Sequence, residues 1–328
     1  MGNIIIYGAG KYGKQYLEIL GKARVLFFVD KNASLHDSCI DGVRIASFDE
    51  LKSMNLEGID VIIAAGEPWN QEIAMRLSGE GIQFYKNIEE YLLSFQQKKL
   101  EKYRNICRGE SCFIIGSGPS LQIKDLEKIQ NKGIATFAPN KIFKIFNETK
   151  WRPDYYVVTD RRIIEYYQDT IADLSINNKF VAYYGIPSLQ KFYNNLKEQG
   201  AVLFRMKEAN TENKYYDFSE DVGKYVIEGR TVIYAMMQIA VYMGFEKLYI
   251  IGVDFSYTDK TGYDKENRDH FCNNYIEKGE KVLITPREYA LKAFTSAKEY
   301  GDENNIIILN ATRGGALEVF DRVNIEEI

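Results

Sequence analysis

One pattern occurs twice in this chain and restricts its fold more than any other feature: an apolar strand-like run, a tight glycine turn and a helical stretch. The first copy begins with the run from Ile4 to Tyr7 and turns at GAGKYG, residues 8–13. The second copy begins with CFII and turns at GSGPSL, residues 116–121. Further apolar runs and helical stretches alternate after each copy, which is typical of parallel sheets with right-handed crossovers. We therefore predict an α/β protein with two Rossmann-like, doubly wound parallel-sheet domains.

The length of the chain supports two domains. Its 328 residues are more than twice the roughly 150 residues of a typical domain. A polar, basic stretch without glycine or proline, from Glu89 to Arg108, separates the two glycine turns and is typical of a helical connector. We predict a nucleotide-binding-type domain over residues 1–90, a helical connector over residues 91–107 and a catalytic domain over residues 108–328.

Composition excludes several classes of protein. The chain holds 42 Lys and Arg against 46 Asp and Glu, a net charge of −4, whereas a duplex nucleic-acid binder normally shows a basic stripe. The four cysteines form no CxxC pair and only two histidines occur, so we expect no zinc site. The balanced charge predicts that the protein has no nucleic-acid partner. Because no signal-peptide pattern opens the chain, we predict a cytoplasmic protein.

The longest nearly apolar stretch, from Thr231 to Phe245, is interrupted by Gln238 and is shorter than the roughly 20 residues of a bilayer span. It predicts a buried helix. We therefore expect no membrane span and, at most, peripheral contact with the inner face of a membrane. Homo-oligomer formation is left open. A closing helix is predicted over residues 286–300, with Thr285 as its N-cap.

The first glycine turn fits the dinucleotide fingerprint G-x-G-x-x-G through Gly8, Gly10 and Gly13, and Asp30 follows Gly10 by twenty residues. Glycines at these positions let backbone approach a pyrophosphate, and an acidic residue at this spacing can bind a ribose hydroxyl. The turn predicts NAD or another nucleotide as a ligand of the first domain. The alternative is that the glycines serve packing alone.

The second turn is of a phosphate-binding type. We expect Gly116 and Gly118 to expose backbone N–H groups, Ser117 and Ser120 to add hydroxyl donors, and Pro119 to stiffen the turn. The turn lacks the lysine of a P-loop, which disfavours a nucleoside triphosphate held in that manner. A purely structural turn is the alternative interpretation.

Three polar residues at strand ends complete the candidate site. Apolar runs end at Asn140, at Asp160 in PDYYVVTD and at Asp254 in IIGVDF. Ligands of open α/β sheets bind at the carboxyl ends of the strands, so we predict that these side chains face the substrate. For Asp254, a cap within the rim of the sheet is an equal alternative.

The ordered set of motifs resembles a known family. GSGPSL, the strand ending in Asn140, the segment from Arg230 to Tyr257, and DHFCNNY around His270 occur in the order found in the small metal-independent bacterial sialyltransferases. With PDYYVVTD and NATRGGALEVF, the set is also similar to a wider family. That family contains the flagellin motility accessory glycosyltransferases and the 6-hydroxymethylpterin diphosphokinase. The first ninety residues resemble an N-terminal module of bacterial polysaccharide-locus proteins.

The sialyltransferase resemblance implies transfer of a sialic-acid-like nonulosonate from a CMP donor to a glycan or another polar acceptor, with no required cofactor or metal. His270 matches the general base of those enzymes. Tyr257 and Tyr263 lie where they place tyrosines that stabilise the departing phosphate. The other predicted substrate-binding residues are in the same motifs: Arg161, Thr231 and Arg313, the last as a partner for a carboxylate or a phosphate.

Two departures from the sialyltransferase pattern keep alternatives open. Ser117 and Asp160 stand where those enzymes carry asparagine, and VTD followed by Arg161 is closer to the motility and diphosphokinase branch. Asp160 would then meet a ribose hydroxyl or a metal ion. The first alternative is therefore a magnesium-dependent diphosphokinase, although the residues after His270 offer no carboxylate for magnesium. The second alternative is a non-catalytic nucleotide-sugar-binding protein.

Overall fold

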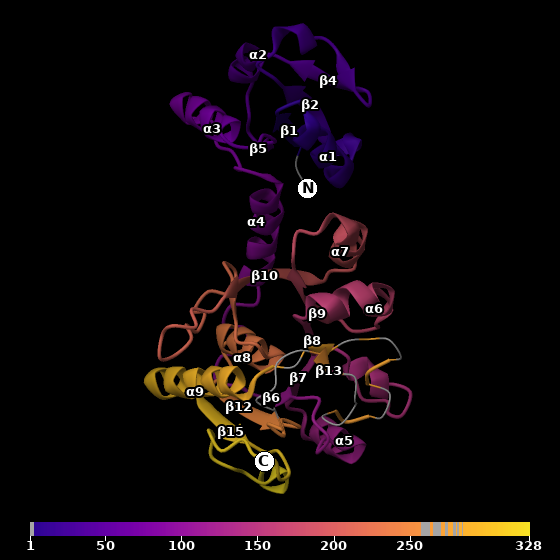
Figure 1. Cartoon of the computed structure of the whole chain (residues 1–328), viewed down its shortest axis with the longest axis vertical. Helices are drawn as coiled ribbons and strands as arrows, with labels where there is room; N and C mark the ends of the chain where they lie inside the picture. The colour runs from indigo at the N-terminus through magenta and orange to yellow at the C-terminus, as the bar shows by residue number, and fades with distance from the viewer. Residues whose placement is uncertain are drawn as a thin grey trace. The chain divides into compact units, whose positions relative to one another are not determined.

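A computed structural model describes residues 3–256, 263–264, 270–272, 275–277, 280, 282–283 and 285–328. The chain divides into two compact units, Met1–Phe95 and Gln96–Ile328 (Figure 1). Helix α4 (Ile88–Glu101) contains the division, which lies within the connector that the sequence predicted over residues 91–107.

The first unit contains a five-stranded sheet in its described residues. The strands pair in parallel, except that the two-residue β3 pairs with β4 in the antiparallel sense. In spatial order the strands are β3 (Cys39–Ile40), β4 (Val43–Ala46), β2 (Val25–Val29), β1 (Asn3–Tyr7) and β5 (Ile59–Ile63). The helices are α1 (Lys11–Leu20), α2 (Phe48–Ser53) and α3 (Trp69–Gly79).

The second unit contains an eight-stranded sheet in the part of the chain that the structure describes, and all its strand pairs are parallel. In spatial order the strands are β11 (Val226–Glu228), β10 (Val202–Glu208), β9 (Asn178–Tyr183), β8 (Tyr155–Val158), β7 (Ala135–Pro139), β6 (Ser111–Ile115), β12 (Lys247–Ile251) and β15 (Ile307–Asn310). The helices are α5 (Ile123–Lys132), α6 (Arg161–Asp173), α7 (Gln190–Glu198), α8 (Val232–Tyr242) and α9 (Arg287–Asn304). A short antiparallel pair joins β13 (Tyr263–Asp264) to β14 (Val282–Leu283). The predicted fold class of two doubly wound α/β domains is confirmed.

The order of strands in the large sheet locates its ligand crevice. From β6 the chain builds β7 to β11 on one side and then returns to place β12 and β15 on the other. The loops that follow β6 and β12 therefore diverge, and open α/β sheets bind their ligands at such a switch point. The central strands are fully buried at positions such as Ile114 and Phe137, as expected for strands covered on both faces.

Helix α8 is apolar and buried along most of its length and packs against β6, β7, β8 and β11. Its one buried polar side chain, Gln238, uses its amide fully. Oε1 accepts from the N–H groups of Ser219 (3.1 Å) and Ile227 (2.9 Å), and Nε2 donates to the carbonyls of Ile227 (3.0 Å) and Tyr234 (3.1 Å). Gln238 therefore joins α8 to β11 and to the irregular segment before it. Among the described residues, no helix has the length and apolarity needed to cross a bilayer.

We expect Gln238→Leu to lower the free energy of unfolding by about 2–5 kcal/mol, because it leaves the buried amides of Ser219 and Ile227 without an acceptor. Urea denaturation followed by circular dichroism measures this loss. Gln130→Leu, on the exposed face of α5, is the control and should change stability by no more than about 0.5 kcal/mol. Equal stability of the two variants would contradict the role assigned to Gln238.

Candidate functional site

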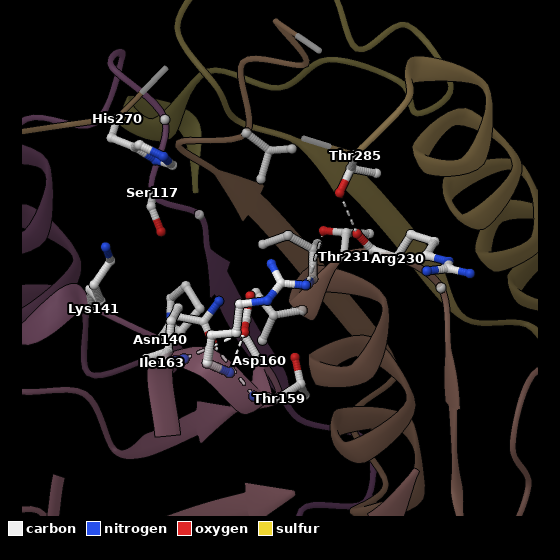
Figure 2. A pocket seen from close by; sticks show the side chains of 18 of the residues that line it. Ser117, Asn140, Lys141, Thr159, Asp160, Ile163, Arg230, Thr231, His270 and Thr285 are labelled. Carbon is white, nitrogen blue, oxygen red and sulfur yellow. Dashed lines mark hydrogen bonds between the residues drawn. The ribbon is translucent and has the colours of Figure 1, made fainter. Parts of the chain in front are cut away.

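A cavity of about 830 Å³ lies at the carboxyl ends of β6, β7, β8 and β12, beside the first turn of α8 (Figure 2). This volume lies within the range of small-molecule sites, about 300–1,000 Å³. Nine of the predicted site residues line it: Gly116, Ser117, Gly118, Asn140, Asp160, Arg161, Thr231, Asp254 and His270. The strand order and the cavity thus bring His270 together with Gly116, which lies 154 residues earlier in the sequence.

Five predicted residues are placed elsewhere or are not described. Pro119, Ser120 and Arg313 lie outside the described residues that line the cavity. Tyr257 lies outside the residues that the structure describes, and Tyr263 is described only as a backbone position in β13. Substrate binding by these residues stays a prediction.

The glycine turn after β6 is packed directly against the loop after β12. A Cβ atom on Gly116 would lie 2.3 Å from the carbonyl oxygen of Gly252, and one on Gly118 would lie 2.0 Å from Oδ2 of Asp254. The N–H groups of Gly116 and Gly118 donate to the carbonyls of Ile251 (2.7 Å) and Gly252 (2.8 Å). The sequence predicted that these two N–H groups are exposed to a phosphate. That prediction is wrong, because the N–H groups hold the two loops together.

Asp254 acts within this packing. Its Oδ2 accepts hydrogen bonds from the backbone N–H (3.2 Å) and the hydroxyl (2.8 Å) of Ser120, near the end of the glycine turn. Outside the cavity, Arg313 donates to Asp125 (2.7 Å) and to the carbonyl of Ser120 (3.3 Å). Both charged side chains thus brace the turn.

Asn140 and Asp160 shape the part of the cavity beyond β7 and β8. Asn140 has a left-handed backbone with φ of 42°, and its carbonyl accepts from the hydroxyl of Tyr156 at 2.5 Å. Asp160 caps α6, because its Oδ1 accepts from the N–H groups of Arg162 (2.8 Å) and Ile163 (3.4 Å). Figure 2 shows Asn140, Thr159 and Asp160 close together on one side of the cavity.

His270 lies beside Ser117. The N–H of the next residue, Phe271, donates to the carbonyl of Ser117 at 2.9 Å. The imidazole stacks on the ring of Tyr275, with 3.7 Å between centroids and 19° between planes. Tyr275 is buried, which raises the pKa of its hydroxyl, and a hydrogen bond with Ser117 opposes that rise. Figure 2 shows His270 and Ser117 on one wall and Thr231, Arg230 and Thr285 across the cavity.

The sequence did not single out several residues that line the cavity. They are Lys141, Thr159, Tyr184, Glu228, Arg230 and Glu280. Lys141 and Arg230 each adjoin a predicted residue, so their place next to a strand end or a helix start was a usable signal. Glu280 lies in a polar stretch with no pattern of its own. Burial lowers the pKa of the Lys141 ammonium, and the nearby Glu280 carboxylate opposes that shift.

Among the described residues, the carboxylates at the cavity form no cluster that fits a resident metal ion. Within the described ranges, no group of three or more His, Cys, Asp or Glu side chains is arranged to hold one. Asp160 contributes one oxygen to the cap of α6. Glu280 is committed to an ion pair with Lys141 at 2.7 Å.

A second cavity, of about 500 Å³, lies in the first unit at the ends of β1, β2 and β5, and Gly8, Gly10 and Asp30 line it. A Cβ atom would lie 2.5 Å from the Ala64 carbonyl if added to Gly8, and 2.0 Å from the Gly8 carbonyl if added to Gly13. At Gly10 a Cβ atom would meet nothing within 4 Å. Packing therefore explains Gly8 and Gly13, whereas it does not explain Gly10.

Asp30 also has contacts within the first unit. Its Oδ2 accepts from the N–H of Ala9 at 2.8 Å, and its Oδ1 accepts from the N–H of Asn32 at 2.9 Å. These bonds tie the end of β2 to the glycine turn and leave further lone pairs on both oxygens, since an ionised carboxylate has about four acceptor sites.

The fold and the cavity at its switch point define a doubly wound α/β protein with a site of nucleotide size. Residues 82–260, more than half of the chain, match the model of the 6-hydroxymethylpterin diphosphokinase MptE-like family, and the chain belongs to that family. Residues 1–88 match the C2185-like N-terminal family. No curated protein and no solved structure was found to match. The diphosphokinase-like part of the predicted resemblance is thereby confirmed and indicates a transferase, whereas its sialyltransferase part stays a prediction.

We expect Asp254→Ala to destabilise the chain by about 1–3 kcal/mol without any ligand present, because the N–H and hydroxyl of Ser120 lose their acceptor. Thermal unfolding of the ligand-free protein measures the effect. Asp302→Ala is the control, since Asp302 is 61% exposed in its ion pair with Lys298 and such pairs contribute about 0–1 kcal/mol. If Asp254→Ala melted with the wild type, Asp254 would not brace the turn.

Proposed function

We propose that this protein is a glycosyltransferase that moves a sialic-acid-like nonulosonate from a CMP donor to a glycan or another polar acceptor in surface-polysaccharide synthesis. The observation that supports this most is the position of His270. His270 comes late in the chain, but it lies beside Ser117 of the glycine turn and lines the same cavity as Asn140 and Asp160. The motifs whose order resembles the sialyltransferases thus meet at one cavity.

The proposed reaction is a direct displacement. The acceptor hydroxyl attacks the anomeric carbon of the donor, the bond from that carbon to the phosphate oxygen breaks, and CMP leaves with the electron pair. Neutral His270 takes the hydroxyl proton at one ring nitrogen. An imidazole suits this step because its usual pKa of about 6.5 lies near neutral pH.

Three arginines at the cavity offer N–H donors to an anionic donor substrate. Arg161, Arg162 and Arg230 line the cavity, and Arg161 and Arg230 pair there with Glu165 and Glu228. Arginine binds phosphate and carboxylate groups through paired N–H donors. We propose that these side chains receive the phosphate of CMP and the carboxylate of the nonulosonate, together with Thr231 at the start of α8. Tyr257 and Tyr263 remain the predicted hydroxyl donors to the leaving phosphate.

The family name favours one other enzyme class, a diphosphokinase. We expect such an enzyme to prefer ATP with magnesium. The donor set described above offers no metal cluster to it, although Asp160 and Glu228 supply carboxylates at the cavity. A nucleotide-sugar-binding protein without catalysis is the remaining candidate. Ligand preference and turnover separate the three.

We expect CMP without magnesium to raise the melting temperature, by an amount equivalent to about 2.7 kcal/mol at a hundred times its Kd. We expect His270→Ala to lower hydrolysis of a CMP-linked sialic acid by about a hundredfold or more while CMP still stabilises the protein, because the base acts on the acceptor and not on the nucleotide. Thermal-shift screening against CMP, CDP, UDP, ATP and NAD, with and without magnesium, and a donor-hydrolysis assay make these measurements.

His36→Ala is the matched control, since His36 is the only other histidine and lies in the first unit. Preferred stabilisation by ATP with magnesium would support the diphosphokinase. Stabilisation by CMP without any turnover would support the binding protein. Undiminished turnover in His270→Ala would remove His270 from the mechanism.

We also propose that the cavity of the first unit binds NAD or another nucleotide, with its pyrophosphate against Gly10. The support is that Gly10, at the start of α1, has φ of −82° and room for a Cβ atom, so neither backbone strain nor packing calls for glycine there. Close approach of a ligand is the remaining physical reason for a glycine in this fingerprint.

Gly10→Ala should keep the stability of the ligand-free chain within about 0.5 kcal/mol and should abolish stabilisation by the nucleotide that the wild type binds. Thermal-shift titration with NAD and nucleoside diphosphates compares the two. Gly13→Ala is the contrasting variant and should destabilise the ligand-free chain, because its Cβ would lie 2.0 Å from a backbone oxygen. An unchanged nucleotide response of Gly10→Ala would contradict this proposal.

We propose that the protein works in the cytoplasm, with any membrane contact peripheral and at the inner face, where a surface-polysaccharide pathway would present its acceptor.

A further inference from the structure

A buried cation lies next to the ring on which His270 stacks. The Lys141 side chain is fully buried, and its ammonium lies 4.3 Å from the ring centroid of Tyr275. The same ammonium donates to the carbonyl of Tyr275 at 2.6 Å. Lys141 therefore holds both the backbone and the ring of Tyr275, and Tyr275 in turn holds the imidazole of His270.

The ammonium of Lys141 is itself anchored. It donates to Oε1 of Glu280 at 2.7 Å, in an ion pair whose side chains are 0% and 9% exposed. The other oxygen of Glu280 accepts from the hydroxyl of Tyr167 and from the N–H of Glu277, both at 3.0 Å. One carboxylate thus joins the loop after β7, helix α6 and the segment that carries His270.

The segment around His270 has little regular structure of its own. Residues 270–272, 275–277 and 280, as far as they are described, belong to no helix or strand. Contacts with other elements therefore help to set the direction of the imidazole. They include the bond from Phe271 to Ser117 and the bonds of Lys141 to the Tyr275 carbonyl and to Glu280, while the imidazole stacks on Tyr275 within the segment. A buried ion pair costs desolvation and adds little net stability, so it is better suited to fixing one geometry than to stabilising the fold.

We propose that Lys141 is a positioning residue that acts through Tyr275 to hold the His270 imidazole toward the cavity. This inference deepens the proposed function, because it assigns the support of the proposed base. The consequence for the reaction is geometric: displacement of a reacting group by about 1 Å can cost about a hundredfold in rate.

The two histidines of the chain permit a direct test that does not depend on the donor. In the proton NMR spectrum of the full chain, the stacked Tyr275 ring shifts the His270 ring protons upfield, and His36 serves as the internal reference. His270→Ala assigns the two sets of signals. We expect Lys141→Met to abolish or strongly reduce the upfield shift of His270 and to leave the signals of His36 unchanged.

Lys144→Met is the matched control. Lys144 follows Lys141 by three residues and pairs with Glu277. Unlike the Lys141 pair, this pair is partly exposed, with 12% of the Lys144 side chain and 40% of the Glu277 side chain accessible. We expect this variant to keep the His270 shift. A Lys141→Met protein that keeps the wild-type shift would overturn the proposal. If Lys141→Met does not fold, Glu280→Gln, which removes the charge and keeps an acceptor oxygen, should reduce the shift in the same direction, and an unchanged shift there would equally overturn it.

The kinetic arm separates positioning from a general loss of structure. We expect Lys141→Met to lower hydrolysis of a CMP-linked sialic acid by about 10- to 100-fold with little change in CMP affinity. In the His270→Ala background the same substitution should have no further effect, because a residue that acts through His270 has nothing left to position. An equal loss in both backgrounds would contradict the proposal. Absence of CMP-sugar turnover in the wild type would overturn the proposed function and leave the NMR result as the test of the Lys141 contact.

Discussion

The close approach of two backbones, the turn after β6 and the loop after β12, is the constraint on which the rest of the site depends. Gly116 and Gly118 leave no space for a Cβ atom at this contact, and their N–H groups bind the facing strand end. With the two loops in contact, Asp254 accepts from Ser120, and the carbonyl of Ser117 in the same turn accepts from the N–H of Phe271. The turn that the two glycines pack against β12 thus also contacts the segment that carries His270.

This arrangement changes the meaning of the second glycine motif. A glycine-rich turn before a helix is usually taken to offer N–H groups to a phosphate. Here the glycine N–H groups are used in the packing of the sheet, and the arginines that line the cavity are Arg161, Arg162 and Arg230. In the glycine motif of the first unit, packing and room for a ligand are divided among the three glycines. Gly8 and Gly13 are explained by packing, whereas Gly10 is open to a ligand.

Much of the candidate site could be predicted because parallel strands end at one edge of a sheet. Asn140 and Asp160 follow apolar strands directly, so their presence at the cavity follows from strand direction alone. Thr285 and Arg313 could not be assigned in this way. Thr285 does not cap α9, because its hydroxyl donates to the carbonyl of Arg230, and Arg313 bonds to Asp125 on the far side of the turn. Both roles depend on partners more than 50 residues away along the chain.

The sequence by itself determined the repeated strand, turn and helix units, and with them the fold class, because apolar periodicity and glycine turns act over a few residues. It also contained the strand-end side chains of the cavity. Only the tertiary structure decided which glycines serve packing. It also decided that the Lys141 ammonium contacts Tyr275, on whose ring His270 stacks. The physical reason is that the clearance around a Cβ atom and the partner of a buried charge depend on segments that folding brings together, and no local pattern records them.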